Sequence, residues 1–215
     1  KNDVDEYGWN NGVTDYPTLF SGVDLEMGGG ERVALLGDNG TGKTTTLNVI
    51  SGLNKAYRGK VIINGKPIKE YRGNSLYRNN LALLPQNPQT LFVKPTVRED
   101  LLELLPKAER RSARLAQIVS LCGLADLLDQ HPYDLSGGEQ QRVAIARALA
   151  SDAKVLLADE PTGNLDTENG KNIIDILKTL AREQGYCVIV VTHDLGIAAE
   201  ADEVLHLSDG MVKAE

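Results

Sequence analysis

The chain has 215 residues, of which 41% are hydrophobic and 25% are charged, and its formal net charge is −7. This composition is typical of a folded globular protein, and the acidic balance argues against a general nucleic-acid binder, which needs clustered positive charge. No apolar run approaches the roughly 20 residues that span a bilayer, and we find no signal peptide, although a start at Lys1 suggests a trimmed N-terminus. We expect one compact domain, with Cys122 and Cys187 as reduced, buried thiols.

Short apolar runs predict strands that are covered on both faces of a parallel sheet. They are "RVALLG" at residues 32–37, "LALL" at 81–84, "KVLLAD" at 154–159 and "CVIVVTHD" at 187–194. Asn-Gly inside "KVIINGKPI" (60–68) and Asp-Gly inside "EVLHLSDGMVKAE" (203–215) are turn dipeptides that predict two antiparallel hairpins.

Between about residues 88 and 150 the pattern becomes helical. Thr96 and Glu99 have the spacing of a capping box, apolar residues recur at helical spacing across 108–129, and good helix formers fill 139–150. We therefore expect an α/β fold in which a core of about 1–87 and 151–215, with an antiparallel β subdomain, carries an inserted helical subdomain at about 88–150.

The segment "GDNGTGKT" at residues 37–44 fits the pattern G-x-x-x-x-G-K-[ST] between a predicted strand and a predicted helix. Gly37, Gly40 and Gly42 would let the backbone wrap a β-phosphate with its N–H groups. Lys43 would bring positive charge to the β- and γ-phosphates, and the Thr44 hydroxyl would ligate Mg²⁺. The alternative, a glycine-rich turn beside a solvated lysine, leaves the flanking strand and helix unexplained, so the segment predicts nucleotide binding.

Polar residues follow the other predicted parallel strands. Asp159 and Glu160 end one strand, where α/β sheets place ligands, and suit a metal ligand and a water-activating carboxylate. His193 follows another strand and is a candidate for contacting the γ-phosphate or Glu160. Gln86 follows "LALL"; taken alone, His193 and Gln86 are more simply a structural histidine and a loop glutamine.

The stretch "LSGGEQQR" at residues 135–142 places two glycines ahead of a helix that Ser136 and Glu139 would cap. Glycine is about 1 kcal/mol worse than alanine inside a helix, so a purely structural helix start has little use for a pair. Two residues without side chains and a helix N-terminus predict a second place where an anion approaches the backbone.

In order along the chain, these motifs resemble the ATP-binding subunit or domain of ABC transporters over nearly the full length. The match comprises Walker A at 37–44, a Q-loop at Gln86, the signature "LSGGEQQR", Walker B "VLLADEP" at 155–161, a D-loop "GNLD" ending at Asp166 and the switch histidine His193. The resemblance implies a P-loop NTPase, RecA-like core and hydrolysis of ATP with Mg²⁺. It also implies that the signature of one domain contacts the γ-phosphate held by a second domain.

The resemblance assigns residues to each part of the site. Catalysis would use Glu160, His193 and Gln86, and the metal would be held by Thr44, Gln86 and Asp159. An aromatic residue would stack on adenine, and Trp9 in "YGW" is our choice, with Tyr7 and Tyr16 as rivals. The remaining nucleotide contacts would come from Gly37, Asp38, Asn39, Gly40, Thr41, Gly42, Lys43, Thr44 and Thr45, and in trans from Ser136, Gly137, Gly138 and Asp166.

The implied partners are a second ATPase domain, identical, different or fused, and an integral membrane transport subunit, with no nucleic acid. The implied location is the cytoplasmic face of the membrane. The stretches at 83–105 and 131–142 resemble the energy-coupling-factor (ECF) branch of vitamin and metal uptake, whereas "DEPTGNLD" (159–166) resembles lipoprotein-releasing and macrolide-exporter ATPases. We weigh the longer match more heavily.

A soluble ABC ATPase acting on DNA or ribosomes is the competing hypothesis. Genome-maintenance members carry a long coiled coil between Walker A and signature, whereas Lys43 and Ser136 are only 93 positions apart, and no charged linker is visible. A regulatory module without turnover would require a damaged catalytic set, whereas Glu160 and His193 are both present.

Overall fold

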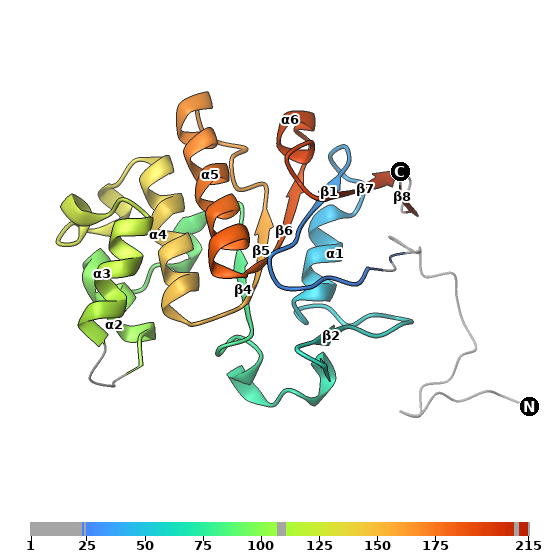
Figure 1. Ribbon diagram of the computed structural model, residues 1–215, viewed down its shortest axis with the longest axis horizontal. Coiled ribbons are helices and arrows are strands. Elements are labelled where there is room, and N and C mark those ends of the chain that lie inside the picture. Colours follow the sequence, from blue (N-terminus) through green and yellow to red (C-terminus); the bar gives the residue numbers. More distant parts are fainter. Residues whose placement is uncertain (1–22, 24, 107–110, 209–210, 215) are drawn as a thin grey trace, which may run out of the picture.

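A six-stranded sheet forms the centre of the computed structural model, which describes residues 23, 25–106, 111–208 and 211–214. Its strands lie in the order β4-β5-β6-β1-β7-β8 (Figure 1). All neighbouring pairs are parallel except β7 and β8. The strands are β1 Arg32–Leu36, β4 Leu81–Leu84, β5 Val155–Asp159, β6 Cys187–Thr192, β7 Glu203–Ser208 and β8 Met211–Ala214.

Alternate residues of the central strands face two different hydrophobic clusters. Val33, Leu35, Leu157 and Val191 pack with Leu47 of α1 (Lys43–Ile50) on one face. The opposite face, which includes Leu156, Ala158, Val188 and Val190, packs against α4 (Gly137–Ala150) and α5 (Thr167–Gln184). Because both faces are covered, every residue of β1 and β5 is buried, which is why these strands lack polar interruptions.

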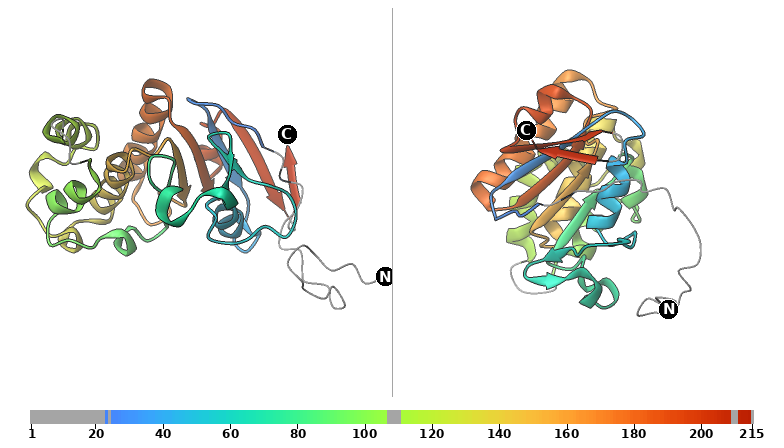
Figure 2. Two further views of the ribbon diagram at one scale, coloured as in Figure 1. Left: turned by 90° about the horizontal axis from the view of Figure 1, so that it is seen from below. Right: turned by 90° about the vertical axis from the view of Figure 1, so that its right-hand side faces the viewer.

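Three helices fill the region predicted to be helical, and the first two lie on the side of α4 and α5 away from α1 (Figures 1 and 2). They are α2 Val97–Leu104, α3 Arg111–Leu121 and α4. Thr96 caps α2 by accepting a hydrogen bond from the Glu99 N–H group at 3.2 Å. The helical pattern at 108–129 breaks after Leu121, because Gly123 has a φ of 61° and ends the helix.

The hairpin predicted at 60–68 is present as β2 (Ile62–Ile63) and β3 (Lys66–Pro67), which form a separate two-stranded sheet. Asn64 and Gly65 connect them with positive φ angles of 50° and 74°, as an Asn-Gly turn requires. The second predicted hairpin is β7 and β8, whose Asp-Gly turn lies outside the described residues. The remaining elements are α6 (Leu195–Ala198) and 3₁₀ turns at Ile68–Glu70, Gly73–Ser75, Pro88–Leu91, Ala125–Leu127 and Pro132–Asp134.

Neither cysteine forms a disulfide. Cys122 is fully buried, and burial raises the pKa of its thiol to about 12. Cys187 is only partly buried, and burial raises its pKa to about 11, so neither thiol is activated. Within the described part of the chain, no helix combines the length and the apolar character needed to span a bilayer.

The predicted α/β architecture is confirmed. Since β1, β5 and β6 are adjacent and parallel, their carboxyl ends meet at one edge of the sheet. The segments that follow them, 37–42, Glu160 and His193, are therefore brought together there.

Candidate active site

The loop between β1 and α1 has the backbone conformation of a phosphate-binding loop. Gly40 and Gly42 have φ angles of 85° and 95°, a region that residues with a Cβ rarely enter. Gly37 is required for space, because a Cβ there would lie 2.5 Å from the Leu207 carbonyl oxygen. The Thr41 hydroxyl donates to the Asp38 carbonyl at 2.9 Å and braces the turn. Asp38 and Asn39 are exposed, and Thr45 is half-buried in the first turn of α1.

The Lys43 ammonium lies within this loop. It donates to the carbonyl oxygens of Gly37 at 2.6 Å and Asp38 at 2.9 Å, and it lies 3.6 Å from Glu160 Oε1. The side chain is 6% exposed, and its charge is held inside the loop by these two carbonyl oxygens. A concentrated positive charge in a curved loop of backbone N–H groups is suited to bind phosphate.

Thr44 and Asp159 are brought together from α1 and β5. The Thr44 hydroxyl donates to Asp159 Oδ1 at 3.3 Å. Burial raises the pKa of Asp159 above its ordinary value, although the Thr44 hydrogen bond opposes the shift. No cluster of three or more His, Cys, Asp or Glu is found among the described residues, so these two side chains alone do not complete a metal site. A hydroxyl and a carboxylate beside a phosphate loop fit Mg²⁺, which also takes phosphate oxygens and water as ligands.

Glu160 is held in a strained, defined position just beyond β5. Its φ is 47°, unusual for a residue other than glycine, and its N–H group donates to the Val191 carbonyl at 2.9 Å. Carboxylate Oε2 lies 3.0 Å from Nδ1 of His193. Oε1 is buried and accepts no hydrogen bond from the residues that the structure describes. One carboxylate oxygen is therefore positioned by His193, while the other has an unused lone pair for a water molecule.

The signature segment begins α4, as predicted. The Glu139 carboxylate accepts hydrogen bonds from the N–H group and the hydroxyl of Ser136, at 2.8 and 2.6 Å. Ser136 and Gly137 are exposed. Gly138 is buried, and a Cβ there would lie 2.6 Å from Asn169 Oδ1 on α5. The expectation that a structural helix start has little use for both glycines is therefore wrong for Gly138, because α4 and α5 need it to approach one another.

The remaining predicted residues lie at different places. Asp166 caps α5, accepting from the Asn169 N–H group at 2.9 Å and side-chain amide at 2.6 Å, and these bonds lower its pKa. Gln86 is exposed beyond β4 and forms no hydrogen bond with the other described site residues. Its expected roles in catalysis and metal binding therefore remain predictions. Trp9 and its rivals Tyr7 and Tyr16 lie outside the described residues.

The signature segment and the phosphate loop do not meet within one chain. α1 and α4 lie on opposite faces of the sheet, and the views in Figures 1 and 2 agree on their separation. No hydrogen bond or ion pair among the described residues joins 136–138 to 37–44.

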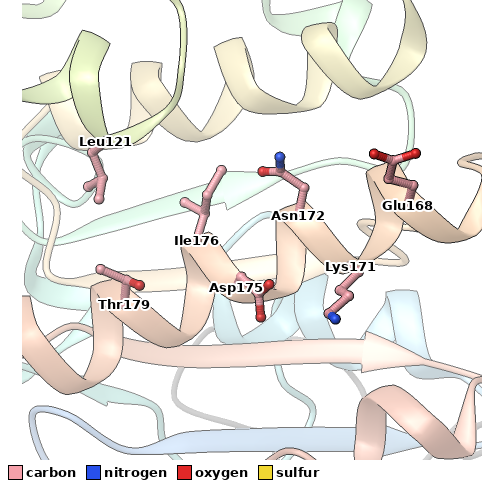
Figure 3. A pocket seen from close by; sticks show the side chains of 7 residues that line it. All are labelled: Leu121, Glu168, Lys171, Asn172, Asp175, Ile176 and Thr179. Atoms are coloured by element: carbon pink, nitrogen blue, oxygen red, sulfur yellow. The ribbon is translucent and has the colours of Figure 1, made fainter.

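An open groove of about 330 Å³ lies along α5, beside Leu121, Asn172 and Asp175 (Figure 3), and none of the predicted site residues lines it.

Comparison with known proteins identifies the chain. The family model described as ABC transporter matches residues 20–163. The chain belongs to the ABC transporter family. It is 37% identical over 200 residues to the lipoprotein-releasing system ATP-binding protein LolD of Syntrophotalea carbinolica, covering 90% of this chain and 88% of LolD. It is also 37% identical over 204 residues to the macrolide export ATP-binding/permease protein MacB 2 of Yersinia pestis, of which the match spans only 30%.

Solved structures of ABC cassettes share the fold. The ATP-binding cassette MJ0796, in a dimeric post-hydrolysis state bound to ADP and Pi, is 34% identical with a TM-score of 0.78 and covers 91% of this chain and 88% of its own. CbiO1 of Clostridium perfringens, part of the ABC transporter complex cbiONQ, is 29% identical with a TM-score of 0.82, at 93% and 83% coverage. The chain is thus an ABC ATPase domain that uses ATP and Mg²⁺.

Sequence reasoning missed Asn169, because its contact with Gly138 joins residues 31 positions apart.

Proposed function

We propose that this chain powers a membrane transporter of the lipoprotein-releasing and macrolide-exporter kind by ATP-driven pairing with a second ATPase domain. One observation carries the proposal: Lys43, Asp159, Glu160 and His193 gather at one edge of the sheet, while the exposed signature start at Ser136 belongs to another part of the same chain. The cluster at the sheet edge and the signature start are each an incomplete half of a site. In a pair of chains, each half of one chain can meet the other half of its partner.

Glu160 is suited to act as the base that orients the attacking water. Its Oε1 atom can accept a water proton, while His193 holds Oε2 and fixes the carboxylate plane. The water oxygen forms the new bond to the γ-phosphorus, the bond to the β-phosphate bridging oxygen breaks, and Lys43 lies where it neutralises the developing negative charge. Bound Mg²⁺ would supply further charge neutralisation from beside Thr44 and Asp159.

The partner domain would complete the pocket with its own signature segment. Ser136 and Gly137 are exposed, and the first N–H groups of α4 stand behind them, so they suit the γ-phosphate held by another chain. Loss of that phosphate on hydrolysis would remove the contact that joins the two chains. Opening and closing of the pair would then move an integral membrane subunit, with the chain located peripherally at the cytoplasmic face.

The branch assignment rests on sequence similarity. The 37% identity to LolD over nearly its whole length and the segment "DEPTGNLD" at 159–166 favour the lipoprotein-releasing and macrolide-exporter kind. ECF-type uptake is the second candidate, supported by the stretch at 83–105 and the TM-score of 0.82 to CbiO1.

Isolation of the intact complex from membranes tests this function. A tagged chain should co-purify with multi-span membrane proteins, and in proteoliposomes the ATPase rate should respond to the cargo. Stimulation by a lipoprotein or a hydrophobic drug would support the proposed branch, and stimulation by a vitamin-binding or metal-binding subunit would support the ECF branch. Co-sedimentation with ribosomes and no membrane partner would contradict a transport function.

A further inference from the structure

Positive charge is concentrated in one surface segment of this acidic chain. Residues 55–78 contain a single acidic residue and carry a net charge of +6, while the whole chain carries −7. The other 191 residues therefore carry −13. All seven basic side chains are exposed, and we call them the basic surface: Lys55, Arg58, Lys60, Lys66, Lys69, Arg72 and Arg78.

For six of the seven members of this surface, all except Lys55, no ion pair with a neighbouring carboxylate is found among the described residues. Lys66 instead lies 4.9 Å from the ring centre of Tyr71, and Arg58 lies 5.7 Å from that of Tyr57. Unpaired, like-charged side chains held close together repel each other unless an anionic partner lies against them.

Part of the basic surface surrounds a hollow. Lys66, Lys69 and Arg72 line an open depression of about 640 Å³ together with Glu70 and Ser75. Three cations and a hydroxyl around one carboxylate leave a net positive depression. This arrangement is suited to a phosphate group, because arginine and lysine are the side chains that pair best with phosphate oxygens.

Large apolar side chains are exposed on the same segment and two positions before it. Leu53, Tyr57 and Ile62 have exposed fractions of 59%, 84% and 46%. Exposing such side chains to water is unfavourable in an isolated protein, and apolar residues interleaved with basic ones are typical of surfaces that contact lipid. A nucleic acid backbone would use the cations but would offer no place for Leu53 and Ile62.

The basic surface is remote from the nucleotide site. β2 and the 3₁₀ turns at Ile68–Glu70 and Gly73–Ser75 lie near the amino ends of the sheet strands, beyond the end of α1, whereas the phosphate loop lies at the carboxyl ends (Figures 1 and 2). A ligand at this surface would therefore leave the phosphate loop free.

We infer that the basic surface binds the anionic phospholipid headgroups of the membrane. The cations of the hollow would pair with the headgroup phosphates, while Tyr57 and Ile62 would enter the headgroup layer. This inference rests on the proposed place of the chain at a membrane, and it adds a contact of the ATPase domain with the lipid itself, separate from its contact with a membrane subunit.

Vesicle flotation of the full chain tests the inference. Vesicles of phosphatidylcholine with phosphatidylglycerol should carry the protein to the top of the gradient, and vesicles of phosphatidylcholine alone should not. Each basic residue near an anionic surface adds about 1 kcal/mol, so removing three should lower the partition coefficient by about 100-fold. The test variant combines Lys66→Gln, Lys69→Gln and Arg72→Gln.

A matched control removes the same charge elsewhere. Lys154, Lys171 and Arg182 are exposed and lie outside the basic surface. The triple variant Lys154→Gln, Lys171→Gln and Arg182→Gln should therefore float like the unaltered chain. Both variants should retain thermal stability and ATP binding, which shows that they fold.

Three results would overturn the inference: equal flotation with neutral vesicles, equal losses in the two triple variants, or retention of RNA without retention of anionic vesicles. None of them would affect ATP-driven pairing of the ATPase domains, so a failure here is separate from a failure of the proposed function.

Discussion

Replacement of Gly138 by alanine tests the packing of the signature helix against α5. The new Cβ would lie 2.6 Å from Oδ1, 2.7 Å from Cγ and 3.0 Å from Cβ of Asn169. Rotation of the Asn169 side chain would move Oδ1 and Cγ away, but its Cβ would stay 3.0 Å from the new Cβ, so the two helices would still have to shift by a few tenths of an ångström. Overpacking of this kind costs about 1–3 kcal/mol, and the better helix preference of alanine recovers up to about 1 kcal/mol. We expect a net loss of about 1–2 kcal/mol, which lowers the melting temperature by about 2–8 °C.

A double-mutant cycle with Asn169→Gly isolates this contact. Asn169→Gly alone should lower the free energy of unfolding by about 1–2 kcal/mol, because a glycine enters α5 and the hydrogen bond from the Asn169 side-chain amide to Asp166 is lost. In that background Gly138→Ala should cost nothing, or stabilise slightly. Urea unfolding of the four proteins gives the coupling energy. An equal cost of Gly138→Ala in both backgrounds would refute the packing explanation, leaving ligand approach as the only reason for this glycine.

Three further predictions concern buried charges. Lys43→Ala should weaken ATP binding by about 100-fold or more in a calorimetric titration, because two charge-assisted contacts to phosphate are lost, and undiminished hydrolysis would refute the phosphate-loop assignment. Asp159→Asn should abolish Mg²⁺-dependent hydrolysis but raise the melting temperature of the nucleotide-free protein at neutral pH. The raised pKa of Asp159 makes its ionised form costly, so this gain should shrink as the pH falls toward about 4, and a pH-independent gain would contradict it. Asp100→Ala should cost about 3–5 kcal/mol in urea unfolding, because fully buried Asp100 pairs with Arg147, and Asp100→Leu with Arg147→Met should recover most of the loss.

The parts of the site that depend on neighbouring residues in sequence were predictable. The phosphate loop, the carboxylates Asp159 and Glu160 and the caps at Thr96 and Ser136 each follow from spacing within a few residues. Their meeting at one edge of the sheet also followed, because buried parallel strands align their carboxyl ends. The contact of His193 with Glu160 is an example.

Other features could not be predicted from the sequence, because they depend on contacts between segments that are distant along the chain. Gly138 is explained by Asn169, which no local pattern links to it. The helical periodicity at 108–129 continues across Gly123, and only its left-handed conformation shows that the helix has ended. Gln86 was assigned to the site from the order of the motifs along the chain. Its side chain is exposed, and its role would depend on ligands or partners outside the chain.

The mass of the Glu160→Gln variant in ATP tests the central claim, that a complete site needs two chains. The 23.3 kDa chain should become a dimer of about twice that mass in light scattering after gel filtration, because ATP stays bound and joins the two domains. Adding Ser136→Arg should return it to a monomer whose ATP affinity is nearly unchanged. A Glu160→Gln chain that remains a monomer with ATP bound, or a Ser136→Arg substitution that leaves the dimer intact, would contradict the account.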